Sequence, residues 1–247
     1  MRFKKTIIFS TIILVCFLIY LYFSGEKLIY VALGDSLAAG VNPYGEVSYS
    51  YTDFIADHLK DERKLELFVK DYTVSGYKSL DVLQDIYNNK KVLIEDKEYN
   101  IRMLLREADL VTISIGANDF MKYFSLNNLH LDDINYYKEQ VDNVLVDVDK
   151  LFSELSKYAK CQVIVVGYYN PFPVLFYNYE KNLDEIFNYV DTKYQALTEE
   201  YGFSYISFYN TFKENANFLP NPFDIHPNLN GYKAIADILI DYYLKKS

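Results

Sequence analysis

The chain has few of the residues that build metal centres and disulfide frameworks. Its 247 residues include three histidines, two cysteines and no tryptophan. Cys16 lies in an N-terminal hydrophobic segment, which leaves Cys161 without a partner for an internal disulfide. The sequence contains no HExxH zinc motif, no phosphate-binding loop and no GxGxxG dinucleotide motif. We therefore expect no metal, no cofactor and no disulfide scaffold.

Basic residues are also in deficit. The chain carries 25 lysines and arginines against 34 acidic residues, a net charge of −9. Nucleic-acid binding requires a basic surface, so we expect no nucleic acid partner. A hydrophobic content of 51% excludes a disordered or collagen-like chain, and the length fits a single α/β domain.

Charge is absent from residues 6–23, which follow three basic residues in the first five positions. A helix of this length spans roughly 27 Å, close to the thickness of a hydrocarbon core. By the positive-inside rule the basic end stays in the cytoplasm, so residues 27–247 should form a domain outside it. Tyr22 and Phe23 occupy positions where signal cleavage requires small residues. We therefore interpret residues 1–26 as an uncleaved transmembrane anchor at the cell membrane, with a cleaved signal and a secreted domain as the alternative.

Short apolar runs and amphipathic segments alternate through the rest of the chain. The expected strands are 28–33, 65–69, 110–115, 162–166 and 204–208, and the expected helices are 48–60, 79–87, 132–158, 183–201 and 230–244. Asn230 is the expected cap of the last helix. Residues 90–100 are compatible with a small hairpin or with the irregular start of a further helix. This order predicts an α/β fold with a five-stranded parallel sheet covered on both faces.

Four short motifs stand at the ends of predicted strands or before the last helix. They are Gly-Asp-Ser-Leu at 34–37, Val-Ser-Gly at 74–76, Gly-Ala-Asn-Asp at 116–119 and Asp-Ile-His-Pro at 224–227. In doubly wound sheets, ligands bind beyond the carboxyl ends of the strands. We therefore expect the four motifs to meet at one edge of the sheet.

Together the motifs contain the groups of a nucleophilic hydrolase. Ser36 is a weak nucleophile unless a base takes its proton, and His226 is the best candidate, because histidine is the side chain that most often acts as a general base. Asp224 would orient the ring and stabilise the imidazolium. The backbone N–H groups of Ser36 and Gly76 and the side-chain amide of Asn118 would stabilise the oxyanion of the tetrahedral intermediate.

Each of these residues also has a purely structural alternative. Ser36 or Asn118 would then cap a turn or a helix, Gly76 would be an ordinary turn glycine, and His226 would bind loop carbonyls. The polar residues for which we expect structural roles alone are His58, His130, Asp35 and Asp119.

The ordered set of motifs resembles the SGNH, or GDSL-type, hydrolase superfamily, which is named after a serine, a glycine, an asparagine and a histidine in four blocks. These map onto Ser36, Gly76, Asn118 and His226, and the resemblance covers about residues 28–244. It implies a flavodoxin-like three-layer α/β/α sandwich and hydrolysis of esters or thioesters without a cofactor. It also implies the same three oxyanion-hole donors.

The spacing around the histidine departs from the family pattern. Many members place the aspartate three residues before the histidine, whereas here Phe223 occupies that position and Asp224 is two residues away. A shorter loop can still bring Asp224 onto the imidazole; a Ser–His dyad supported by a backbone carbonyl is the alternative. Ala38 breaks the G-x-S-x-G pattern, which speaks against an ordinary α/β-hydrolase elbow.

These observations predict a membrane-tethered, extracytoplasmic serine esterase or lipase that hydrolyses acyl or acetyl esters. Its substrate would be an ester-containing small molecule, a lipid or an acylated envelope glycan. An acyltransferase that uses the same site and a catalytically silent binding module are the alternatives. The aromatic-rich stretch 167–179 would line an acyl pocket, stack on sugars, rest near lipid or pack on itself as a lid.

Overall fold

The computed structural model describes residues 27–123, 131–172 and 175–246. The predicted N-terminal anchor and His130 lie outside these ranges. None of the helices within them combines the length and the hydropathy that a bilayer crossing requires.

A parallel five-stranded sheet forms the centre of the fold, in the order β2-β1-β5-β6-β7. Its strands are β1 (Leu28–Gly34), β2 (Leu65–Thr73), β5 (Leu110–Ser114), β6 (Gln162–Val166) and β7 (Ser204–Ile206). From β1 the chain continues to β2 on one side, and the later strands β5, β6 and β7 follow on the other. The strand order therefore reverses between β1 and β5, where a ligand-binding crevice is expected in a doubly wound sheet.

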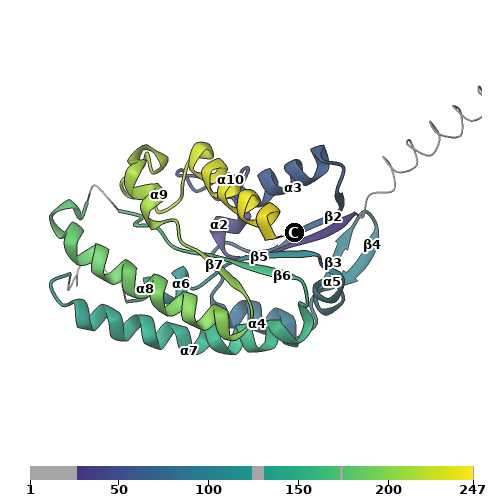
Figure 1. The fold of residues 1–247 in the computed structure, drawn as a ribbon, viewed down its shortest axis with the longest axis horizontal. Coiled ribbons are helices and arrows are strands. Elements are labelled where there is room, and N and C mark those ends of the chain that lie inside the picture. Colours follow the sequence, from purple (N-terminus) through teal and green to yellow (C-terminus); the bar gives the residue numbers. More distant parts are fainter. Residues whose placement is uncertain (1–26, 124–130, 173–174, 247) are drawn as a thin grey trace, which may run out of the picture.

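Helices cover both faces of the sheet (Figure 1). One face carries α4 (Ser79–Tyr87), α5 (Ile101–Glu107), α7 (Ile134–Tyr158) and α8 (Glu180–Glu200). The other carries α3 (Tyr51–Asp61), α9 (Tyr209–Glu214) and α10 (Leu229–Lys246). Shorter elements are α2 (Ser36–Ala39), α6 (Ala117–Met121), η1 (Tyr177–Tyr179) and η2 (Ala216–Phe218). This confirms the predicted α/β fold with a parallel sheet flanked by helices.

Side-chain alternation along the central strands builds the two cores. In β1, Val31 and Leu33 pack under the α7 face, while Tyr30 and Ala32 pack under the α10 face. All four side chains are fully buried. Successive residues of a strand point to opposite faces, so a strand covered on both sides must be apolar throughout. The continuous apolar run that identified β1 in the sequence reflects this double burial.

The uncertain stretch 90–100 is a hairpin. Strands β3 (Lys91–Ile94) and β4 (Lys97–Asn100) pair antiparallel around Glu95 and Asp96. Both turn residues have positive φ, 49° and 64°, as a two-residue hairpin turn requires. The Asn100 side chain then caps α5 by accepting from the N–H of Met103.

The predicted cap of the last helix is wrong. Asn230 lies inside α10, and the Asn228 side chain accepts the N–H of Gly231 at 3.0 Å instead. The helix therefore begins at Leu229, three residues after His226. This early start fixes the histidine close to a rigid element.

Candidate active site

The end of β1 presents Ser36 beside β5. Gly34 has a φ of +126°, and a Cβ at this position would lie 2.1 Å from the carbonyl oxygen of Ser114, so only glycine allows the close approach. Asp35 then caps α2 by accepting the N–H of Leu37 at 3.1 Å. Asp35, rather than Ser36, is thus the capping residue. Ser36 becomes the first residue of α2, with its N–H free of partners in the described part of the chain.

His226 bridges Ser36 and Asp224. Its Nε2 lies 2.8 Å from the Oγ of Ser36, although 190 positions separate the two residues in the sequence. Its Nδ1 lies 2.8 Å from Oδ1 of Asp224. A carboxylate can only accept, so Nδ1 carries the proton, and Nε2 is left as an acceptor for the serine hydroxyl.

A tight turn explains why a separation of two residues is sufficient. The same Oδ1 of Asp224 accepts the backbone N–H of His226 at 2.8 Å, which closes an Asx-type turn. The turn brings the carboxylate of Asp224 to the Nδ1 edge of the imidazole ring. Phe223, at the position that many family members give to the aspartate, is exposed.

Asn118 lies in α6, which follows β5, and Gly76 lies in the turn between β2 and α4. Asn118 is the second residue of α6, whose capping position is Gly116, so Asn118 is not the helix cap. Its Nδ2 donates to the carbonyl oxygen of Tyr77 at 2.9 Å. A carbonyl can only accept, so this bond fixes the amide orientation and leaves the second N–H of Nδ2 for another acceptor. Gly76 has a φ of +86° and nothing within 4 Å of a Cβ position, which indicates an open backbone.

Asp119 anchors the segment that contains Gly76. Its carboxylate accepts from the N–H of Ser79 at 2.9 Å and from the Ser79 hydroxyl at 3.1 Å. Together with the contact between Asn118 and Tyr77, this holds residues 76–79 to α6 at two points. Asp119 therefore does more than shape its own turn, because it fixes Ser79, which lies 40 positions away and three residues after Gly76.

Asp35 is a carboxyl buried beside the nucleophile. Besides the N–H of Leu37, it accepts the hydroxyl of Ser114 at 2.8 Å. Burial raises the pKa of Asp35 from 3.8 to about 6, against the opposing effect of these two hydrogen bonds.

The raised pKa of Asp35 predicts a pH-dependent stability. Between pH 4 and 6 the folded state binds more protons at Asp35 than the unfolded state does, so its contribution to stability is complete below 3.8 and is lost as the pH rises through about 6. Asp35→Asn keeps both acceptor contacts and does not titrate. We expect the free energy of unfolding of the variant, relative to the wild type, to rise by about 2 kcal/mol between pH 4 and pH 7. Urea unfolding at both pH values measures this; equal differences at the two would contradict it.

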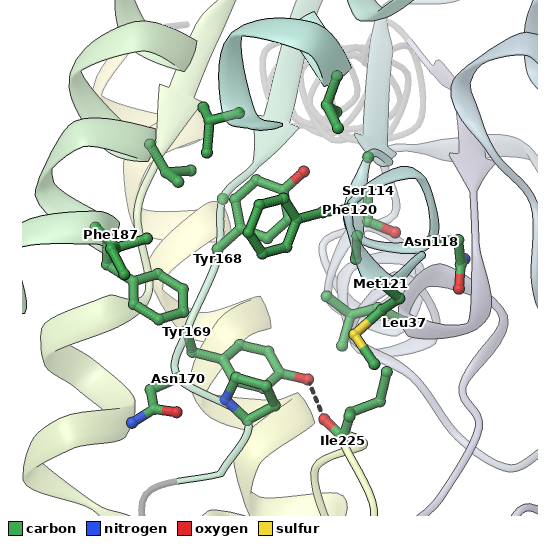
Figure 2. A pocket seen from close by; sticks show the side chains of 18 of the residues that line it. Leu37, Ser114, Asn118, Phe120, Met121, Tyr168, Tyr169, Asn170, Phe187 and Ile225 are labelled. Atoms are coloured by element: carbon green, nitrogen blue, oxygen red, sulfur yellow. Dashed lines mark hydrogen bonds between the residues drawn. The ribbon is translucent and has the colours of Figure 1, made fainter. Parts of the chain in front are cut away.

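A cavity of about 140 Å³ opens beside Ser36 and His226. In Figure 2, Tyr169 and Phe187 face Leu37 and Met121 across it. Four aromatic residues from the stretch after β6 line the cavity, namely Tyr168, Tyr169, Phe172 and Phe176. Of the possible roles of the stretch 167–179, the structure therefore favours the lining of a pocket. The hydroxyl of Tyr169 also donates to the carbonyl of Ile225 at 2.8 Å, which braces the loop just before the histidine.

Further residues of the cavity come from α7 and α8, which the sequence did not single out. Within the described ranges, no group of three or more histidine, cysteine and acidic side chains has the arrangement of a metal site. His58 is half-buried in α3, on the opposite face of the sheet from α7 and α8. Of the predicted site residues, Ser36, Asn118 and His226 line this cavity, whereas Gly76 and Asp224 do not.

The chain is similar to known proteins in sequence and in fold. A family model described as the GDSL-like Lipase/Acylhydrolase family matches residues 32–234. The uncharacterized protein YpmR of Bacillus subtilis (strain 168) is 27% identical over 220 residues, which cover 85% of this chain and 79% of that protein. A lipase from a goat rumen metagenome has a TM-score of 0.65 at 19% identity, over 86% of this chain and 96% of its own. Phospholipase A1 from Streptomyces albidoflavus NA297 has a TM-score of 0.64 at 17% identity, over 88% and 99%.

The two structural likenesses show the fold, and the family match covers most of the chain. It includes all four motifs, from the serine that follows β1 to the histidine that precedes α10. The chain therefore belongs to the GDSL-like lipase/acylhydrolase family, the SGNH hydrolases.

Proposed function

We propose that the protein is a serine esterase or lipase in which Ser36 is the nucleophile, His226 the general base and Asp224 the residue that orients the imidazole. The observation that supports this most directly is the hydrogen-bonded chain from Ser36 Oγ through His226 to Asp224, with 2.8 Å at each step. A nucleophile, a base and an orienting carboxylate in sequence are the groups that acyl transfer to a serine requires.

The reaction would proceed by double displacement. The Oγ of Ser36 attacks the ester carbonyl carbon while its proton passes to Nε2 of His226. The tetrahedral intermediate collapses, and the departing alcohol takes that proton. Water then attacks the acyl-enzyme, gives a proton to Nε2, and releases the acid as the proton returns to Oγ. Asp224 stabilises the imidazolium that forms in each half-reaction.

The oxyanion would be held by the N–H groups of Ser36 and Gly76 and by the free N–H of the Asn118 amide. Asn118→Ala should lower kcat about 10²–10³-fold with little change in KM, because the amide binds charge that develops in the transition state. Steady-state kinetics on p-nitrophenyl butyrate measures the effect. Asn170→Ala, which removes an amide that lines the same cavity, is the matched control. Comparable losses in both variants would argue against an oxyanion role for Asn118.

The family relationship indicates an ester substrate, and two proteins of similar structure are a lipase and a phospholipase A1.

We also propose that residues 6–23 anchor the protein in the cell membrane with the catalytic domain outside the cytoplasm. Their uncharged sequence behind a basic start supports this orientation. Protease added to intact cells should digest the domain; protection until lysis would contradict the proposed side.

Hydrolysis by the full-length protein in detergent tests the proposed reaction. We expect it to release free acid from p-nitrophenyl esters and to react with a fluorophosphonate probe. Transfer of the acyl group to an added alcohol in place of free acid would favour the acyltransferase. Absence of both turnover and probe labelling would favour the silent binding module.

A further inference from the structure

The cavity extends from the proposed nucleophile into an apolar chamber between α7 and α8. We define the α7/α8 chamber by the side chains that line it from these helices, chiefly Tyr137, Val141, Val144, Leu183, Ile186 and Val190. All six are buried. Ser36 and His226 line the same cavity, so the chamber is continuous with the reacting groups.

The position of the chamber along α7 and α8 follows from the packing of the two helices. Lys138 pairs with Glu185 at 2.7 Å, and Asp142 pairs with Lys193 at 3.0 Å. The helices therefore run parallel, and equivalent turns face each other. Relative to the starts of α7 and α8, Val144 and Val190 lie about three turns in, roughly 15 Å along the helix axes. They line the deep end of the chamber.

The hydroxyl groups near the deep end already have partners. Tyr168 and Tyr194 share a hydrogen bond of 2.7 Å, and the Tyr168 hydroxyl lies 2.9 Å from the carbonyl of Ile115. The α7 and α8 side chains that define the chamber carry one polar group, the hydroxyl of Tyr137. A sugar or another polyol would lose its bonds to water there with little replacement, whereas an alkyl chain gains from burial.

The volume of the whole cavity, from Ser36 to the α7/α8 chamber, limits the size of the acyl group that it holds. An engineered apolar cavity of about 150 Å³ holds a benzene molecule, that is, six carbons. The cavity in this protein, at about 140 Å³, is of similar size. An acetyl group would leave most of it empty, and a group of about six carbons fills it.

We propose that the α7/α8 chamber binds the acyl chain of the substrate, so that the enzyme selects medium-chain fatty acyl esters of about six to eight carbons over acetyl esters. This inference rests on the proposed function. The alcohol must depart before water attacks, while the acyl group stays bonded to Ser36. An apolar chamber that is continuous with Ser36 suits the part that stays bonded to the enzyme.

A chain-length series on the full-length protein in detergent tests the inference. We expect kcat/KM for p-nitrophenyl esters to rise about four-fold per methylene from acetate to hexanoate, about 10²-fold in total. The rise should level off near octanoate. Acetate hydrolysed as well as hexanoate would overturn the inference while leaving the proposed function intact.

Changes in chamber volume should move this preference. Val144→Phe fills the deep end and should lower the hexanoate-to-acetate ratio of kcat/KM about 10²-fold. Ile186→Ala enlarges the chamber and should shift the optimum to longer esters. Val146→Phe is the matched control, because Val146 is on the same helix but 55% exposed, and its ratio should equal that of the wild type. Equal ratios in Val144→Phe and Val146→Phe would place the acyl chain elsewhere.

A binding measurement separates failure of the inference from failure of the proposed function. Calorimetry on the full-length Ser36→Ala variant should detect binding of octanoate, and adding Val144→Phe should abolish it. If no ester is hydrolysed by the wild type but octanoate binds in this manner, the proposed function fails and the chamber assignment stands. Octanoate binding that is absent, or insensitive to Val144→Phe, overturns the chamber assignment.

Discussion

Alanine at position 36 is expected to lower kcat/KM for p-nitrophenyl hexanoate by about six orders of magnitude, toward the small rate that binding and the oxyanion hole alone provide. Without Oγ no acyl-enzyme forms, and His226 has no hydroxyl to deprotonate. The side chain is small and lies at the start of a four-residue helix capped by Asp35, so the fold should be unaffected. Equal circular dichroism spectra and melting temperatures for wild type and variant check this.

Ser75 supplies the matched control for this prediction. It is the only other serine in the four motifs and lies beside the proposed oxyanion donor Gly76. Its side chain is exposed, so Ser75→Ala should keep activity near the wild-type value. A large loss in Ser75→Ala together with a small one in Ser36→Ala would reverse the assignment of the nucleophile.

Substitution of the two residues behind the nucleophile should give graded losses. His226→Ala is expected to cost about 10⁶-fold in kcat, because no other base in the described part of the chain contacts the serine hydroxyl, whereas Asp224→Ala should cost about 10⁴-fold. In the second variant the imidazole is present, but its tautomer is no longer fixed and its cationic form is no longer stabilised. Steady-state kinetics on the same ester measures both losses. A cost below about ten-fold for Asp224→Ala would indicate a Ser–His dyad.

The candidate site could be predicted from sequence because its position follows from a topological rule. Ser36 and Asn118 follow adjacent parallel strands, whose carboxyl ends must lie at one edge of the sheet. The contact between Asp224 and His226 was harder to predict, since the residue spacing differs from the family pattern. It depends on the Asx-type turn, a local geometry that a short asparagine or aspartate side chain permits but does not dictate.

The α7/α8 chamber could not be predicted from the same sequence. Val141 and Val144 line the cavity, while Val148 and Leu151 continue the same apolar stripe of α7 into the solid core. All four follow one helical spacing, which reports that a side chain is buried but not whether its neighbour is another side chain or a void. Only the packing of α8 against α7 distinguishes the two cases.

The capping residue of a helix is also difficult to predict from the sequence alone. Asn228 and Asn230 both precede Gly231, and either is an acceptable cap by residue type. The choice of Asn228 follows from where the chain leaves Pro227, which the tertiary fold determines. The sequence of residues 90–100 is compatible with a hairpin or with the irregular start of a helix. It does not decide between them, because the charged turn residues Glu95 and Asp96 carry a weaker turn signal than glycine or asparagine.

The proposed reaction depends on activation of the Ser36 hydroxyl by the imidazole of His226. The most direct measurement is to treat the full-length protein with a fluorophosphonate and to locate the modified residue by peptide mass spectrometry. We expect one phosphonylated site, on Ser36, with labelling that His226→Ala abolishes. A label on any other residue, or equal labelling of the wild type and His226→Ala, would contradict it.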